Sequence, residues 1–332
     1  ECKSAVMEVT SHALVQGRVS SIDFDVALFT NLTLDHLDYH GTMEAYCNAK
    51  NKLFLHLGAK PSLRKKKFPA IAIGNLDSPW FSAITRGCKA KLFTYGLDPK
   101  ADLAASDLRL SPIGTYFTMH YKSKAYPVEI PLAGRFNVYN ALAAVSVAIS
   151  KGYSLEKIIP LMKEFPPVSG RLEAVPNPLG LKIYVDFAHS DDALQNVLEA
   201  LTEFKTGRII TVFGCGGDRD QSKRALMASV AERFSDLSIV TSDNPRSEDP
   251  EAICRQILGG FKKPDSFAVE LDRKLAIKKA LSMADQNDII LIAGKGHEAY
   301  QIFAHKTIEF DDRKIALSLC QELAGQLESV ER

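Results

Sequence analysis

The chain has 332 residues, 46% of them hydrophobic and 24% charged, with a formal net charge of +1. This length suits about two domains with full cores, and the balanced charge argues against nucleic acid or an acidic surface as the main partner. Six scattered cysteines without a C-x-x-C motif predict neither a disulfide framework nor a thiolate metal site. No apolar run reaches the ~18 residues of a membrane span and no signal peptide is visible. We therefore expect a cytoplasmic protein, and we also expect a monomer. The first residue is not methionine and the sequence begins in mid-strand, which indicates the tail of a longer protein.

The first half of the chain contains apolar runs that predict strands. Residues 5–9 predict a buried strand with Glu8 near its carboxyl end, residues 13–18 a short helix that presents Gln16 and Arg18, and residues 24–29 a second strand. Ligands gather at the carboxyl ends of parallel strands, so Glu8 and His36 are expected to converge. Later segments predict two more strands, an antiparallel hairpin and a long helix, at 69–73, 91–95, 115–121 with 126–132, and 141–151.

A ligand-rich stretch follows the second strand. Asp35, His36, Asp38 and His40 fall within six residues and offer oxygen and imidazole ligands that Mg²⁺ or Zn²⁺ accepts. The next segment predicts a helix that begins after Thr42 as N-cap. Its apolar stripe consists of Met43, Tyr46, Cys47, Leu53, Phe54 and Leu57.

Lys50 falls in the middle of that stripe, whereas Asn51 lies off it. A lysine on a buried face must be paired, neutralised or modified, because an isolated buried ammonium is costly. The alternative is that its apolar stem lies along the stripe and its ammonium reaches water.

Residues 165–170, F-P-P-V-S-G, break the pattern and divide two predicted domains, 1–166 and 167–332. Beyond them strands and helices alternate, which predicts a mainly parallel, doubly wound α/β sheet of Rossmann-like type. The predicted strands are 181–187, 208–213, 237–241, 266–270 and 288–293, and the helices begin near 190, 223, 248, 273 and 312.

Polar motifs follow four of these strands: D-F-A-H at 186–189, G-C-G-G-D-R-D at 214–220, S-D-N-P-R at 242–246 and G-K-G-H-E at 294–298. Each motif alone is ordinary turn chemistry. Four charged motifs at one edge of a sheet instead predict a rim that holds a small polar molecule.

The ordered motifs resemble the Mur ligases, ATP-dependent amide-forming enzymes of peptidoglycan synthesis, over essentially the whole chain. The matching motifs are E-V-T-S-H-A-L, D-H-L-D-Y-H-G, A-K-N-K-L-F, G-R-F-N-V-Y-N-A, G-R-L-E, V-D-F-A-H, F-G-C-G-G-D-R-D, D-N-P-R-S-E-D-P and G-K-G-H-E. The last three are similar to those of members that add meso-diaminopimelate to UDP-N-acetylmuramoyl-L-alanyl-D-glutamate (UDP-MurNAc-L-Ala-D-Glu).

The sequence departs from the family pattern in two respects. The phosphate-binding loop G-T-x-G-K-T is absent, as is the domain that grips the uridine nucleotide, so we expect residues 1–332 alone to bind ATP weakly and to form no peptide bond. Phe187, Ser190 and Asp191 also replace the usual residues after the first strand of the second domain.

The resemblance implies ATP and Mg²⁺ as cofactors and an acyl-phosphate intermediate. It implies that Glu8, His36 and a carbamylated Lys50 hold Mg²⁺ and form the catalytic centre. The remaining implied binding residues are Thr10, Gln16 and Arg18 for the nucleotide-peptide, Asn137, Asn140, Arg171, Asp186 and His189 for ATP, and Arg219, Asp243, Asn244, Pro245, Arg246, Gly294 and Glu298 for diaminopimelate.

Three alternatives compete with this interpretation. A related ligase that adds lysine would tend to lack the D-N-P-R motif, so Arg246 separates the two. A catalytically silent binding module would fit the missing phosphate loop, and a genuine start at residue 1 would favour it. A dinucleotide-dependent oxidoreductase rests on Gly214-Cys-Gly-Gly alone, which is not the G-x-G-x-x-G pattern and follows the second strand of its domain.

Overall fold

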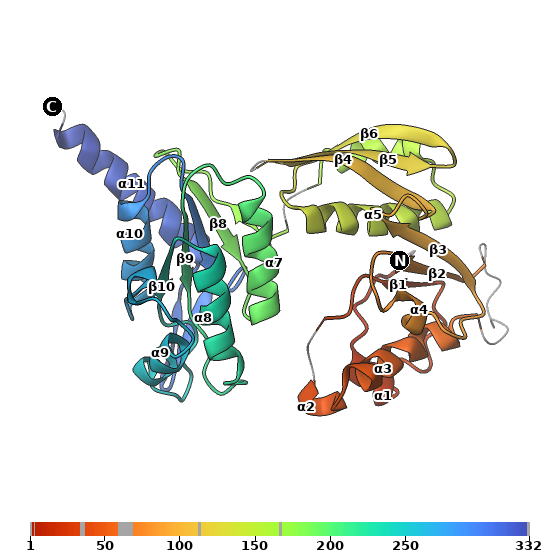
Figure 1. Ribbon diagram of the computed structural model, residues 1–332, viewed down its shortest axis with the longest axis horizontal. Coiled ribbons are helices and arrows are strands. Elements are labelled where there is room, and N and C mark those ends of the chain that lie inside the picture. The colour runs from red at the N-terminus through yellow and green to blue at the C-terminus, as the bar shows by residue number, and fades with distance from the viewer. Residues whose placement is uncertain are drawn as a thin grey trace. The chain divides into compact units, whose positions relative to one another are not determined.

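The structure, a computed structural model, describes residues 2, 4–33, 37–58, 69–111, 114–165 and 168–330, without the side chains of Asp38 and of residues 327–330. The chain forms two compact units. Unit 1 consists of residues 1–109, 115–130 and 135–165, and unit 2 of residues 110–114, 131–134 and 166–332. Each unit contains its own six-stranded sheet (Figure 1).

The sheet of unit 1 has the strand order β1-β2-β3-β4-β5-β6. Strands β1 to β4 pair in parallel, and β5 and β6 form the antiparallel hairpin that the alternating pattern predicts. The strands are β1 (Val26–Phe29), β2 (Ile71–Asn75), β3 (Lys91–Gly96), β4 (Leu103–Ser111), β5 (Gly114–Tyr121) and β6 (Lys124–Ile130).

The helices of unit 1 are α1 (Ser11–Val15), α2 (Leu37–His40), α3 (Met43–His56), α4 (Phe81–Ile84), α5 (Arg135–Ser150) and α6 (Leu155–Met162). Helix α3 begins where the sequence predicts, because the Oγ1 atom of Thr42 accepts a hydrogen bond from Ala45 N at 3.1 Å. The predicted apolar stripe packs against β1 and β2, with Tyr46, Cys47 and Phe54 fully buried. Helix α5 packs against β2 and β3.

The predicted strand at residues 5–9 is wrong. Residues 4–10 have no regular secondary structure, and Val6 is 99% exposed. An apolar run forms a strand only where a neighbouring strand supplies hydrogen-bond partners, and β1 pairs only with β2 in the described part of the sheet. The strand-end argument for bringing Glu8 toward His36 therefore fails.

The sheet of unit 2 has the order β11-β10-β9-β12-β8-β7, and its first five strands are parallel. The antiparallel edge strand β7 and a separate hairpin of β13 and β14 were not predicted. The strands are β7 (Glu173–Ala174), β8 (Lys182–Asp186), β9 (Ile209–Phe213), β10 (Leu237–Val240), β11 (Phe267–Val269), β12 (Ile289–Ala293), β13 (Tyr300–Phe303) and β14 (Lys306–Glu309). This is the doubly wound α/β sheet that the sequence predicts.

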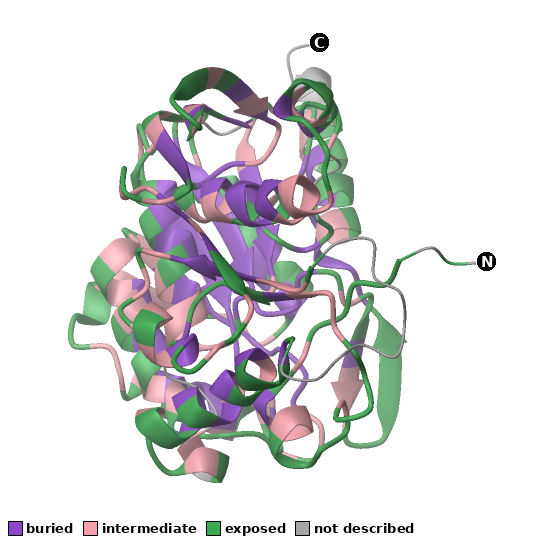
Figure 2. Ribbon diagram, turned by 90° about the vertical axis from the view of Figure 1, so that its right-hand side faces the viewer, coloured by how far each residue is buried: buried purple, intermediate pink, exposed green. Residues whose placement is uncertain are grey.

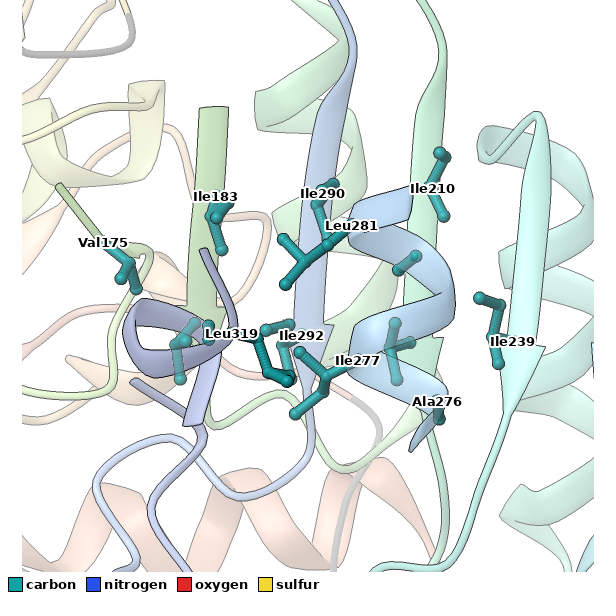
Figure 3. Close-up of a cluster of buried hydrophobic side chains, with 14 of the residues drawn as sticks. Val175, Ile183, Ile210, Ile239, Ala276, Ile277, Leu281, Ile290, Ile292 and Leu319 are labelled. Carbon is teal, nitrogen blue, oxygen red and sulfur yellow. The ribbon is translucent and has the colours of Figure 1, made fainter. Parts of the chain in front are cut away.

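Helices cover both faces of this sheet. They are α7 (Asp191–Thr202), α8 (Lys223–Phe234), α9 (Pro250–Leu258), α10 (Arg273–Met283) and α11 (Asp312–Val330), with a 3₁₀ turn η1 (Pro264–Ser266). Helices α10 and α11 enclose an aliphatic core against β8, β9, β10 and β12 (Figure 3). Figure 2 shows buried residues concentrated in the strands and on parts of the helices. The loops that follow the strands of unit 2 also contain buried polar residues, among them Asp243, Asn244 and Lys295.

Candidate functional site

Three polar loops meet at the carboxyl edge of the unit 2 sheet. They follow the neighbouring strands β10, β9 and β12, and comprise residues 242–246, 214–220 and 294–298. Because the three strands run in parallel, their carboxyl ends lie side by side. Hydrogen bonds join the loops, including Asn244 to Glu298 and Gly217 to Asn244. The structure thus brings together most of the residues expected to bind an amino acid.

Asn244 lies at the centre of these loops and is almost fully buried. Its Nδ2 donates to Glu298 Oε2 at 2.9 Å, and its Oδ1 accepts from Lys295 Nζ at 3.1 Å and from Ile302 N at 3.0 Å. Both ends of the amide are therefore engaged by the protein. This arrangement suits Asn244 to orienting its neighbours.

Asp243 and Glu298 supply the acidic groups of the site. Asp243 is 7% exposed, and its carboxylate accepts no hydrogen bond within the described part of the chain. Gly294 has φ +114°, and a Cβ at this position would lie only 2.6 Å from Asp243 Oδ2. Glycine is therefore the residue that fits beside the Asp243 carboxylate. The Glu298 side chain is partly exposed. Two carboxylates at one sheet edge are suited to binding an ammonium group.

Arg246 leaves the same loop with φ +51° and is half-buried. Its backbone N–H donates to Ile302 O at 3.1 Å, and its Nη1 donates to Gly217 O at 2.7 Å. The guanidinium carries five N–H donors, so one bond to Gly217 leaves a fork for a carboxylate. A cavity of about 310 Å³ lies beside it, lined by Pro245, Arg246, Glu248, Pro250, Phe303, Ala304, His305 and Lys306.

Arg219 projects from the glycine-rich loop and is exposed, with Nη1 donating to Asp218 O at 3.0 Å. A partly buried ion pair supports that loop. Arg224 donates to both oxygens of Glu248, at 2.8 and 2.9 Å, and Glu248 Oε1 also accepts from Asp218 N at 2.6 Å. These hydrogen bonds, above all those from Arg224, lower the pKa of Glu248. The pair therefore joins the two loops that present Arg219 and Arg246.

Asp186 ends β8 and is buried. Leu172 N donates to its Oδ2 at 2.6 Å and Ala188 N to its Oδ1 at 2.7 Å. Burial raises the pKa of Asp186 despite these two bonds. The carboxylate fixes the backbone around Arg171 and His189, both of which are exposed. Arg171 Cζ lies 5.0 Å from the centre of the Phe187 ring. The backbone oxygen of Phe187 lies 2.9 Å from His189 Nδ1.

Asn137 and Asn140 lie one turn apart in the first half of α5, where Asn140 Nδ2 donates to Asn137 Oδ1 at 3.2 Å. Between them Tyr139 donates its hydroxyl to Asp77 Oδ2 at 2.8 Å. Asp77 also accepts from the backbone N–H groups of Leu97 and Asp98. Tyr139 therefore ties the start of α5 to the loops after β2 and β3.

Thr10, Gln16 and Arg18, the residues expected to bind the nucleotide-peptide, are exposed around helix α1. The hydroxyl of Thr10 caps this helix, accepting from Ala13 N at 3.2 Å. Gln16 is the residue at its carboxyl end. The structure therefore groups the three residues around one short helix.

The expected metal ligands are placed only in part. Glu8 is exposed, Lys50 is half-buried on α3, and His36 lies outside the described residues. Lys50 Nζ lies 5.1 Å from the centre of the Tyr46 ring. Among the described residues no group of three or more His, Cys, Asp or Glu side chains could hold a metal ion. The convergence of Glu8, His36 and Lys50 stays a prediction.

Profiles of two protein families match the chain: the Mur ligase middle domain over residues 1–148 and the Mur ligase, glutamate ligase domain over residues 170–296. The chain belongs to the Mur ligase family. UDP-N-acetylmuramoyl-L-alanyl-D-glutamate--2,6-diaminopimelate ligase from Chlamydia caviae is 48% identical over 318 residues, which cover 94% of this chain and 63% of that protein. The Geobacillus kaustophilus protein of the same name is 46% identical, with 95% and 64% covered.

A solved structure of a ligase with that name is 35% identical and superposes with a TM-score of 0.64, covering 96% of this chain and 64% of the solved one. The Mur ligase chain therefore spans slightly less than two thirds of these relatives. No helix in the part of the chain that the structure describes is long and apolar enough to cross a membrane.

Sequence reasoning did not select several residues that organise this Mur ligase site. Lys295 falls within G-K-G-H-E, and Arg224 and Gln301 lie outside the quoted motifs. Gln301 Nε2 donates to Asp243 O at 2.7 Å, which fixes the backbone of the D-N-P-R loop. The position of Lys295 inside a glycine-rich motif at a strand end is the sequence signal by which it could have been found.

Proposed function

We propose that this chain contains the catalytic and amino-acid-binding parts of a ligase that adds meso-diaminopimelate to UDP-MurNAc-L-Ala-D-Glu with consumption of ATP. The observation that carries the proposal is the loop cluster at the carboxyl edge of the unit 2 sheet. It presents Arg246 and Arg219 together with Asp243 and Glu298. Cytoplasmic ATP would place the reaction in the cytoplasm, and we propose that the protein acts as a monomer.

The charges of the loop cluster match a diamino diacid. Diaminopimelate carries two carboxylates and two amines, so its site needs separated cations and acidic groups. A guanidinium fork binds a carboxylate through two parallel hydrogen bonds. Lysine lacks the distal carboxylate and would leave Arg246 unpaired in a closed site. The affinity for lysine should therefore be lower than the affinity for diaminopimelate.

The chemistry proceeds in two steps. An oxygen of the D-glutamate γ-carboxylate attacks the γ-phosphorus of ATP, forming an acyl phosphate and releasing ADP. The free amine of the amino acid then attacks the acyl carbon, loses a proton and expels phosphate as the amide bond forms. Neither step needs a covalent enzyme nucleophile, so the protein contributes positioning and charge stabilisation.

The side chains proposed for unit 1 serve the first step. Glu8, His36 and a carbamylated Lys50 would hold Mg²⁺, which supplies positive charge at the transferring phosphoryl group. The half-buried position of Lys50 on α3 supports this role. Asn137 and Asn140 would contact adenine, while Arg171, Asp186 and His189 would serve phosphate and ribose.

The test of the function is a steady-state assay of phosphate release by the full-length protein with UDP-MurNAc-L-Ala-D-Glu, ATP and either diaminopimelate or lysine. Diaminopimelate is expected to support turnover and lysine to support little. Turnover with lysine equal to that with diaminopimelate would favour the lysine-adding ligase. Absence of turnover with both amino acids would favour the binding module.

Replacing Arg246 by alanine is expected to lower kcat/KM for diaminopimelate by about 30- to 1000-fold, because a charge-assisted pair in a closed site loses one partner. The KM for ATP should change little. Arg246→Lys keeps the positive charge but not the two-pronged guanidinium. Its kcat/KM for diaminopimelate should therefore lie between those of wild type and Arg246→Ala. Arg255→Ala is the control, since Arg255 is an exposed arginine on α9. Undiminished preference for diaminopimelate in Arg246→Ala would show that this loop does not read the distal carboxylate.

A further inference from the structure

Lys295 is a fully buried lysine inside the amino-acid site. Its exposed fraction is 0%, and its Nζ donates to Asn244 Oδ1 at 3.1 Å and to Glu298 Oε2 at 3.3 Å. The same atom lies 5.6 Å from the centre of the Tyr300 ring. A buried ammonium is costly unless it is paired and hydrogen-bonded, so its retention here needs a reason.

We propose that Lys295 is a positioning residue for amino-acid selection: it holds the Glu298 carboxylate and the Asn244 amide in the orientation that accepts the distal ammonium of a diamino acid. This inference rests on the proposed function and deepens it. Lys295 itself touches no substrate, because its ammonium is enclosed by Asn244, Glu298 and the Tyr300 ring.

The orientation of Asn244 depends on this ammonium. Two donors, Lys295 Nζ and Ile302 N, face Asn244 Oδ1. If the amide turned over, its NH₂ group would face both donors and lose its bond to Glu298. An unpaired buried donor costs the full desolvation penalty, so the amide stays as observed.

The orientation of Glu298 follows from the same contacts. Its Oε2 accepts from Asn244 Nδ2 and from Lys295 Nζ. Its Oε1 accepts no hydrogen bond from the residues that the structure describes, which leaves that oxygen for an incoming ammonium. Lys295 and Asn244 therefore hold one oxygen of Glu298 and leave the other for the substrate.

The charges of the three side chains also support a positioning role for Lys295. Asp243 and Glu298 contribute two negative charges at this edge, and Lys295 pairs with the second of them at 3.3 Å. Without Lys295 the Glu298 carboxylate would lose this partner and the contact that fixes its orientation. Removal of Lys295 therefore does not strengthen ammonium binding.

The experiment compares Lys295→Met with wild type in the full-length protein, with Lys278→Met as the matched control, since Lys278 is exposed on α10. Lys295→Met should lower kcat/KM for diaminopimelate by about 10- to 100-fold, mainly through KM, because Glu298 loses the buried cation that pairs with it. The KM for ATP should stay close to that of wild type. Lys295→Gln, which keeps a buried donor, replaces the methionine variant if the latter does not fold.

A double variant separates positioning from general destabilisation. If Lys295 acts through Glu298, Lys295→Met should add little to the loss already caused by Glu298→Gln, whereas independent effects would multiply. Multiplied losses, or an undiminished kcat/KM in both Lys295 variants, would overturn the inference while leaving the proposed function intact. A wild type that uses no diamino acid would instead overturn the proposed function and this inference with it.

Discussion

Lys50→Ala in the full-length protein is expected to lower the rate of ligation by on the order of 10³-fold or more, because charge stabilisation at the transferring phosphoryl group carries most of the catalysis. Alanine is the best helix former, so α3 should remain folded. The assay is ATP-dependent formation of the diaminopimelate adduct across a range of Mg²⁺ concentrations. Added short carboxylic acids should recover part of the activity if a carbamate at Lys50 supplies an oxygen ligand.

Two variants sharpen this expectation. Lys52→Ala is the matched control, since Lys52 is an exposed lysine of the same helix, and it should retain activity. Lys50→Arg keeps a positive charge but forms no carbamate, so it should be as inactive as Lys50→Ala. An active Lys50→Arg would show that Lys50 acts as a cation, and the carbamate would have to be abandoned.

The architecture of unit 2 is predictable from its sequence because each strand carries its own signal. Strands β9 and β12 are buried at every position, as expected for parallel strands covered on both faces. Amphipathic helices separate them, and parallel order then places all the strand-end motifs at one edge. The meeting of Asp243, Asn244 and Glu298 follows from topology alone.

Hairpin β13–β14 carries no comparable signal. Its turn, Ala304-His305, contains no glycine or asparagine, and β14 is exposed at all four positions. Yet this hairpin supplies Gln301 and Ile302, which fix the D-N-P-R loop. Such contacts depend on tertiary placement, which no local pattern encodes.

A polar residue can be mistaken for a ligand-binding or surface residue when its side chain is hydrogen-bonded within the protein. Asn51 lies off the apolar stripe of α3 but is buried, because its Nδ2 donates to Ile84 O and Arg86 O at the end of α4. Asn244 is likewise engaged at both ends of its amide. The sequence predicts which side chains are polar, and packing decides which of them remain free for a ligand.

Asp312→Ala is expected to cause the largest loss of stability in unit 2. Arg273 and Asp312 are both fully buried, and Arg273 Nε and Nη2 each donate to an oxygen of Asp312 at 2.8 Å. Removing the carboxylate leaves a buried guanidinium uncompensated, which costs about 3–5 kcal/mol. If unit 2 unfolds cooperatively, Tm should fall by roughly 6–20 °C. Differential scanning calorimetry of the full-length protein measures this.

Asp312→Ala should also disturb the proposed amino-acid site, because Arg273 Nη2 donates to the carbonyl of Ala293, the residue before Gly294, at 3.0 Å. Glu251→Ala removes the partner of an exposed arginine and should cost less than about 1 kcal/mol. The double variant Arg273→Met, Asp312→Leu removes both charges and should recover most of the stability, since a buried pair replaced by apolar groups is often neutral. A double variant as unstable as Asp312→Ala would show that shape, and not an unpaired charge, sets the cost.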